Sequence, residues 1–274
     1  MPQGTVIEAV LKRDRTLVLT GIVAITALAW AYMVYLAWRM GDMDMGSSME
    51  MGGGMAMEMA MPQMQAWGPM DLVLMFVMWA VMMVAMMTPS AAPMVLLFAT
   101  IRRKRSQDVG AFASTFVFLS GYLAVWTAYS LLATLAQWGL HSAALLSPMM
   151  VTTSPIVGGA ILVGAGIFQM TPLKHACLKH CRSPLDFIIS GWREGTGGAF
   201  HMGLSHGVFC TGCCWILMLL LFVAGVMNLL WIGLIAAFVL AEKALPKGEI
   251  VARVAGVILM LVGIGVVARH VLGA

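Results

Sequence analysis

Long apolar runs separated by short polar stretches dominate the chain. A helix needs about 20 apolar residues to cross the hydrocarbon core of a bilayer. Seven runs approach or exceed this length, although the fourth and sixth are short and the second is long. They cover residues 17–38, 71–100, 111–136, 153–170, 203–225, 227–242 and 251–269. The pattern predicts an all-α, polytopic membrane helix bundle of about seven transmembrane helices.

Composition favours a membrane protein over a soluble one. Of the 274 residues, 61% are hydrophobic and 10% are charged, and the mean hydropathy is +0.92. Such values are typical of membrane proteins. The formal net charge of +4 is therefore interpreted first as an orientation signal at the membrane surface. We expect membrane lipid as a partner and no nucleic acid.

The basic residues predict which helix ends face the cytoplasm. If the N-terminus is cytoplasmic, 14 of the 16 Lys and Arg residues lie on that side, and only Arg39 and Arg269 lie outside. This asymmetry agrees with the positive-inside rule. It places residues 171–200 inside and the C-terminus outside. The first apolar run is long for a signal peptide and no cleavage site follows it, which predicts an uncleaved anchor.

This topology divides the chain into an N-terminal anchor helix at 1–38, a Met-rich extracytoplasmic loop at 39–69 and a six-helix membrane domain with a Cys/His cluster at 70–274. The loop holds ten methionines between Met40 and Met64. Thioethers are soft ligands, so their Met-x-Met spacing predicts capture of copper(I). The alternative is a low-complexity linker whose methionines scavenge oxidants. The predicted ligands are Met43, Met45, Met49, Met51, Met55, Met57, Met59 and Met61.

A stripe of soft ligand residues opens the fifth apolar run from the predicted cytoplasmic side. His206, Cys210, Cys213 and Cys214 are spaced by about one helical turn, so they share one helix face. Free cysteine is also a common small buried residue, and packing is the alternative explanation for this stripe.

A second group of the same kind precedes the stripe. Cys177 and Cys181 have an i, i+4 spacing, with His175 and His180 beside them. Two such groups at one membrane face favour a metal site over packing. Thiolates and imidazoles select copper(I), zinc or iron–sulfur centres over calcium or magnesium. Copper(I) fits best because the Met-rich loop suits the same ion, while zinc and an iron–sulfur centre remain alternatives.

Three stretches of the sequence carry a resemblance to known proteins: "AMMTPSAAPMVLLFA" at 85–99, "FQMTPLKHACLKHCRSPL" at 168–185 and "GLSHGVFCTGCCWILMLLLFVAGVMNLLW" at 203–231. Over most of residues 70–272 the chain resembles an uncharacterised family of predicted metal-binding bacterial integral membrane proteins. The resemblance implies a multi-pass protein of the bacterial inner (cytoplasmic) membrane. It also implies metal binding through Cys177, His180, Cys181, His206, Cys210, Cys213 and Cys214. His175 and His201 do not belong to the pattern, and we expect them to be interfacial.

Other polar and small residues have more than one explanation. Glu242 and Lys243 form either an ion pair or an interfacial pair, and Glu242 is an alternative hydrogen-bond acceptor for a ligand histidine. Pro89 and Pro93 predict a bend in the second helix. One face of that helix carries Met75, Met78, Met82 and Met86, which either pack or form stepping sites for a metal ion. Glycines at 158, 159, 164, 166, 256, 263 and 265 predict close helix approach.

These features favour copper handling: a copper(I)-binding integral membrane protein for copper uptake, for transfer, or for delivery to a copper enzyme. The expected partners are a copper-dependent membrane enzyme or a copper chaperone. One alternative is a membrane oxidoreductase that uses a metal centre or the dithiol of Cys210 and Cys213. Another is a structural subunit of a membrane complex stapled by metal. The copper hypothesis requires no catalytic reaction, whereas the oxidoreductase alternative does.

The predicted topology can be tested at the C-terminus. A cysteine introduced at residue 274 is expected to react with a membrane-impermeant thiol reagent from outside the cell, because seven crossings place the two termini on opposite sides. Labelling of intact cells and of inverted membrane vesicles measures this directly. Reaction from the cytoplasmic side alone would contradict the topology.

Overall fold

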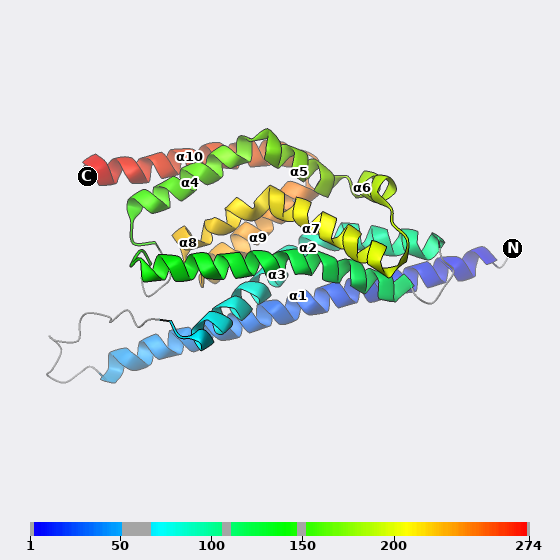
Figure 1. The fold of residues 1–274 in the computed structure, drawn as a ribbon, viewed down its shortest axis with the longest axis horizontal. Helices are drawn as coiled ribbons and strands as arrows, with labels where there is room; N and C mark the ends of the chain where they lie inside the picture. Colours follow the sequence, from blue (N-terminus) through cyan, green and yellow to red (C-terminus); the bar gives the residue numbers. More distant parts are fainter. Residues whose placement is uncertain (1–2, 51–66, 106–110, 147–151, 273–274) are drawn as a thin grey trace.

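The structure is a computed structural model that describes residues 3–50, 67–105, 111–146 and 152–272 (Figure 1). The described residues are almost entirely helical, which confirms the all-α class. The only β geometry within them is an isolated bridge between Leu146 and Thr152. The helices are α1 (Gln3–Glu50), α2 (Pro69–Arg105), α3 (Ala111–Ser142), α4 (Pro155–Met170), α5 (Pro172–Arg182), α6 (Pro184–Gly191), α7 (Gly195–Leu219), α8 (Leu221–Ala224), α9 (Leu229–Ala244) and α10 (Gly248–Leu272).

Five helical segments of the described chain are long and apolar enough to cross a membrane. A sixth is obtained if α4 and α5, bent by 63° at their junction, count as one span. Length and composition therefore do not reproduce the predicted seven spans, because α9 has only 16 residues. The five segments are Arg15–Arg39, Pro69–Arg105, Ala113–Ser142, Gly195–Ala224 and Gly248–Leu272.

The first helix is longer than the sequence pattern predicts. Helix α1 continues to Glu50, so residues 39–50 are helical rather than part of a loop. Extending an existing helix adds one hydrogen bond for each residue fixed, which is far less costly than starting a new helix. Of the eight predicted methionine ligands, Met51, Met55, Met57, Met59 and Met61 lie outside the described residues. The side chains of the other three lie outside the described part as well.

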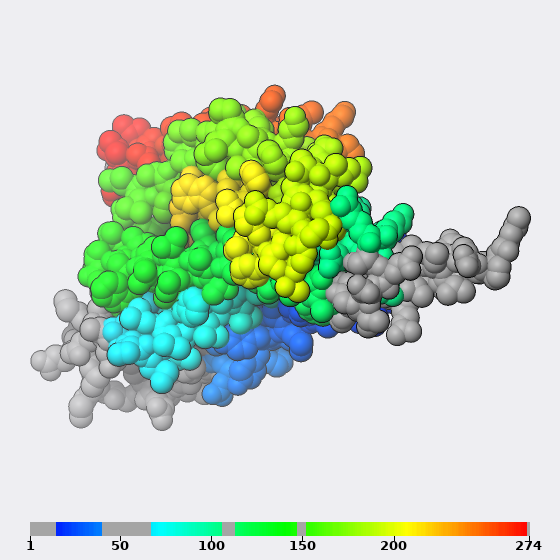
Figure 2. All heavy atoms as spheres, turned by 45° about the vertical axis from the view of Figure 1, so that its right-hand side comes forward, coloured from blue at the N-terminus to red at the C-terminus, as the bar shows by residue number. Residues whose placement is uncertain are grey.

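Successive long helices run in alternating directions, and the two chain ends lie at opposite ends of the bundle (Figure 1). Helix α1 packs on α2, α2 on α3, and α3 on α7, while α4 packs on α10. Two helices connect these groups. Helix α5 contacts α7 and α4, and helix α9 contacts α2 and α10. The same order is visible on the surface, where α1 and the start of α2 line one side and α10 lines the other (Figure 2).

The backbone carbonyl freed by Pro89 in the middle of α2 has a side-chain partner. Pro89 has no backbone N–H and so cannot bond to the carbonyl of Ala85. The indole N–H of Trp30 on α1 donates to that oxygen instead, at 3.2 Å. Around this point the predicted methionine stripe is buried, with Met78, Met82 and Met86 each no more than 2% exposed. Their burial in the core supports a packing role.

Glycine allows α4 and α10 to approach closely. A Cβ atom on Gly166 would lie 2.6 Å from the carbonyl oxygen of Gly256, and one on Gly159 would lie 2.9 Å from that of Gly263. These distances confirm the close approach predicted for those four glycines. Gly164 and Gly265 have open space at the same position, so that prediction is wrong for them.

The contrast between Gly166 and Gly164 gives a matched test within one helix. Gly166→Ala is expected to destabilise the protein, because the new methyl group forces α10 away from α4. Gly164→Ala is expected to leave stability unchanged or to raise it by about 0.5–1 kcal/mol, since alanine favours helix. Denaturant unfolding in detergent, followed by circular dichroism, compares the two. Equal stability of both variants would contradict the packing account.

Candidate functional site

Helix α5 brings the first group of cysteines into the bundle. Pro172 ends α4 and starts α5, and the side chain of Thr171 caps the new helix by accepting from the Lys174 N–H at 3.3 Å. The stretch predicted as a cytoplasmic connection is therefore a helix that packs against α7. The sequence pattern did not predict this packing. The chain bends by 63° between α4 and α5, and this bend keeps α5 against the bundle.

The two cysteine groups, far apart in sequence, meet where α5 contacts α7. The thiol of Cys181 lies close enough to interact with those of Cys210 and Cys213. Cys177 lies over Gly212, where an added Cβ atom would be 3.0 Å from its sulfur. A side chain larger than hydrogen at 212 would therefore press on Cys177. We refer to Cys181, Cys210, Cys213 and Cys214 as the thiol cluster.

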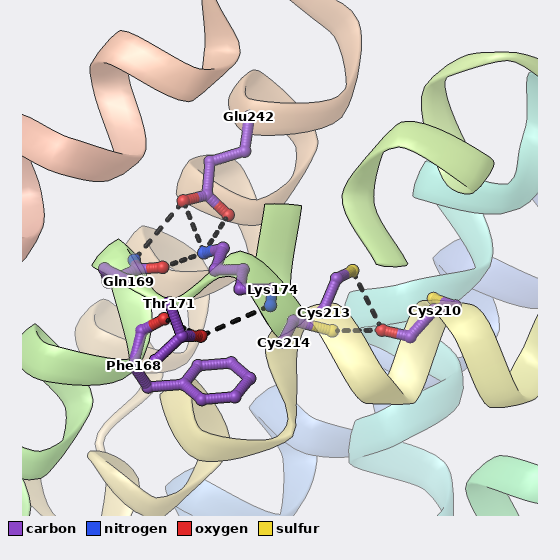
Figure 3. A network of polar contacts seen from close by, with 8 residues as sticks. All are labelled: Phe168, Gln169, Thr171, Lys174, Cys210, Cys213, Cys214 and Glu242. Atoms are coloured by element: carbon purple, nitrogen blue, oxygen red, sulfur yellow. Dashed lines mark hydrogen bonds and ion pairs between the residues drawn. The ribbon is translucent and has the colours of Figure 1, made fainter. Parts of the chain in front are cut away.

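The three α7 cysteines are almost completely buried. The thiols of Cys213 and Cys214 donate to the carbonyl oxygen of Cys210, at 3.0 and 2.9 Å (Figure 3). Cys214 also lies 3.9 Å from the sulfur of Met87, which comes from α2. All five cysteines are free thiols. The cluster thus combines thiols with one buried thioether, which are soft donors of the kind that copper(I) prefers.

A lysine and a tyrosine contact the sulfur of Cys210. The ammonium of Lys243 on α9 lies 2.9 Å from it and 3.0 Å from the hydroxyl of Ser90. The hydroxyl of Tyr122 lies 3.1 Å from the same sulfur and donates to the Met87 carbonyl at 3.0 Å. A positive charge at this distance stabilises negative charge on the sulfur. The site can therefore hold a thiolate away from bulk water.

His206 lies one turn before Cys210 and is 3% exposed. Its ring is stacked on Tyr122, at a centroid distance of 5.5 Å, and meets Phe187 edge-on at 5.8 Å. Neither ring nitrogen has a hydrogen-bond partner in the described part of the protein. A buried polar group without a partner is costly and calls for a functional explanation. A bound metal ion would supply the missing partner.

His180 lies at the outer side of this arrangement. Its ring is exposed and stacks flat on Phe209, with centroids 4.3 Å apart, and its Nδ1 is bonded to the Ala176 carbonyl at 2.9 Å. The remaining predicted ligands, His206 and the cysteines, lie deeper. No group of three or more His, Cys, Asp or Glu side chains in the described residues is placed to hold a metal ion. The soft donors therefore lie close together without forming a closed cage.

A buried ion pair fixes α9 relative to α4 and α5. The ammonium of Lys174 lies 2.7 and 2.9 Å from the two carboxylate oxygens of Glu242, and Gln169 bonds to both side chains (Figure 3). Lys174 is 0% and Glu242 1% exposed. Glu242 and Lys243 thus do not pair with each other, contrary to one sequence-based interpretation. Consecutive helical residues point about 100° apart, so Glu242 faces α4 and α5 while Lys243 faces the thiol cluster.

Comparison with known proteins identifies the family. A family model described as PpoB2, copper chaperone, matches residues 76–266. The chain belongs to this copper chaperone family. The match includes the thiol cluster and His206, and it leaves out α1 and the Met-rich segment. No curated protein and no solved structure matches the chain. The family supports the predicted link to copper, which the sequence resemblance had expressed only as metal binding.

Sequence reasoning did not identify Tyr122 or Met87 as contacts of the thiol cluster. Met87 stands outside the methionine stripe of α2, and Tyr122 is one aromatic residue in an apolar helix. Their importance depends on contacts between helices that no local spacing encodes.

The Lys174–Glu242 pair can be tested by a double-mutant cycle. Either Lys174→Met or Glu242→Gln alone is expected to lower the free energy of unfolding by about 3–5 kcal/mol, because each leaves a buried charge without its partner. The double variant is expected to lose less free energy of unfolding than the two single variants lose together. Unfolding of all four proteins in one detergent measures the coupling. Additive effects would show that the pair does not fix α9.

Proposed function

We propose that this member of the copper chaperone family is an integral membrane protein that binds copper(I) at the thiol cluster. It then transfers the ion to a copper-dependent membrane enzyme or to another copper chaperone. The observation that carries the proposal is the meeting of Cys181 with Cys210 and Cys213, beside Met87 and the unpartnered His206. Family membership favours this role over a dithiol oxidoreductase and over a metal-stapled structural subunit.

The ligands of the cluster suit copper(I) better than zinc or an iron–sulfur centre. Structural zinc sites and common iron–sulfur clusters are enclosed by four protein ligands. The thiol cluster differs from such sites because a thioether, that of Met87, and an imidazole, that of His206, lie beside it. Thioether and thiolate ligands together select copper(I).

Lys243 provides the balancing charge for this site. A copper(I) ion held by two thiolates carries a net charge of −1, and a thiolate without copper carries the same charge. The ammonium 2.9 Å from Cys210 therefore suits both states. Copper binding to a thiol releases its proton, so loading and unloading exchange copper(I) for protons. The site thus changes its total charge little during transfer.

The proposed topology has seven crossings with the N-terminus in the cytoplasm of a bacterial cell. The alternating helix directions and the opposite positions of the chain ends support it (Figure 1), with α9 as a short crossing. The basic last turn of α2 also supports this orientation, because cytoplasmic loops carry an excess of Lys and Arg. In this orientation the Met-rich segment collects copper on the outer side and the thiol cluster receives it within the bundle.

The proposal is tested by anaerobic loading of detergent-purified full-length protein with copper(I), followed by a chelator wash and elemental analysis. Wild type is expected to retain copper, and the Cys210→Ser/Cys213→Ser/Cys214→Ser variant is expected to retain none. Met87→Leu is expected to lower the affinity, while Met94→Leu, a matched buried methionine on the same helix, is not. Replacing the eight predicted Met-rich ligands by leucine should leave the retained copper unchanged. Equal retention by wild type and the cysteine variant would refute the proposal.

A further inference from the structure

A cavity of about 260 Å³ lies beside the thiol cluster, between α5, α6 and α7. His180 comes from α5, Phe187 from α6, and His201, Met202 and Phe209 from α7. Both histidines are exposed, so the cavity is open to the surface, whereas Met202 is 2% exposed. No Asp or Glu is among the lining residues, and Arg193 adds a positive charge. This lining disfavours calcium and magnesium and offers imidazole and thioether donors.

The hydrogen bond of His180 prepares its other nitrogen for a ligand. The Ala176 carbonyl can only accept, so Nδ1 of His180 carries the proton and Nε2 keeps a free lone pair. The flat contact with Phe209, with an interplanar angle of 1°, fixes the plane of the ring. Backbone carbonyls orient metal-binding histidines in the same way.

The cavity lies next to Cys181 of the thiol cluster along the chain and next to His206 in space. His180 is the chain neighbour of Cys181, and Phe187, which lines the cavity, contacts the ring of the buried His206. Phe187 and Phe209 meet edge-on with centroids 6.2 Å apart. Phe187 therefore contacts both the cavity and the ring of the buried His206.

We infer that this cavity is a second copper(I) site, in which His180 and His201, with Met202, hold the ion while it passes between the thiol cluster and a soluble thiol-bearing acceptor. The inference rests on the proposed function, because the cavity receives its ion from the cluster. The transfer itself is a ligand exchange: one copper–sulfur bond of the cluster breaks as a copper–nitrogen bond to His180 or His201 forms. No electron is transferred, and copper stays in the +1 state throughout.

The test compares wild type with His180→Ala/His201→Ala and with His270→Ala, a matched exposed histidine far from the cavity on α10. Each protein is loaded anaerobically with copper(I), and removal of copper by a water-soluble copper(I) chelator is followed by absorbance. The double variant is expected to keep the cluster-bound copper, to lose the weaker second equivalent, and to release copper about tenfold more slowly. Mutations around a metal site typically change metal affinity or activity by about 10–100-fold. His270→Ala should behave as wild type.

X-ray absorption provides a second readout that does not depend on rates. Imidazole scattering is expected from the second copper equivalent in wild type and not in the double variant. Unchanged release and unchanged scattering in the double variant would overturn the inference. Copper bound in the cavity but not retained by the cluster would refute the proposed function and leave the cavity site standing. His180→Gln/His201→Gln repeats the test with side chains of similar size, and circular dichroism checks that each variant is folded.

Discussion

Lys174 and Lys243 place two ammonium groups inside a bundle of apolar helices, and each needs a partner there. A buried charge without a partner costs several kcal/mol, so it constrains the surrounding helices strongly. Lys174 is held by Glu242 and Gln169, and Lys243 by Cys210 and Ser90. Both contacts depend on the end of α9, which presents Glu242 and Lys243 in different directions. The position of α9 therefore determines both the buried ion pair and the charge beside the thiol cluster.

Glycine and proline make room for this arrangement. On α3 and α7 the backbones approach so closely that a Cβ atom on Gly121 or Gly207 would collide with the other helix. This contact puts Tyr122 beside His206 and Cys210. The bend at Thr171 and Pro172 positions another ligand residue. It turns α5 onto α7 and so brings Cys181 to the cluster. Small residues and breaks in helices thus position the large soft ligands.

The resulting site consists of buried soft donor atoms, and an open cavity lined by His180 and His201 lies next to it. Its thiols and thioether suit copper(I), and its ammonium balances their charge. A protein that only stored copper would gain nothing from an adjacent open cavity with two histidines. A protein that transfers copper needs both a retaining site and an accessible one, because the acceptor must reach the ion. The chaperone function and the cavity site are in this sense two parts of one proposal.

The sequence by itself determined the all-α class, the presence of long apolar helices, the Cys/His stripe of α7 and several close glycine contacts, including Gly159 and Gly166. These depend on the length of apolar runs and on helical periodicity, which are local properties of the chain. Only the tertiary structure decided that α5 packs on α7, that Glu242 pairs with Lys174, and that Tyr122 and Met87 join the cluster. Periodicity defines which residues share a helix face, but the partner of that face depends on helix rotation, crossing and bending. Those are set by the packing of the whole bundle, so no local spacing could have specified them.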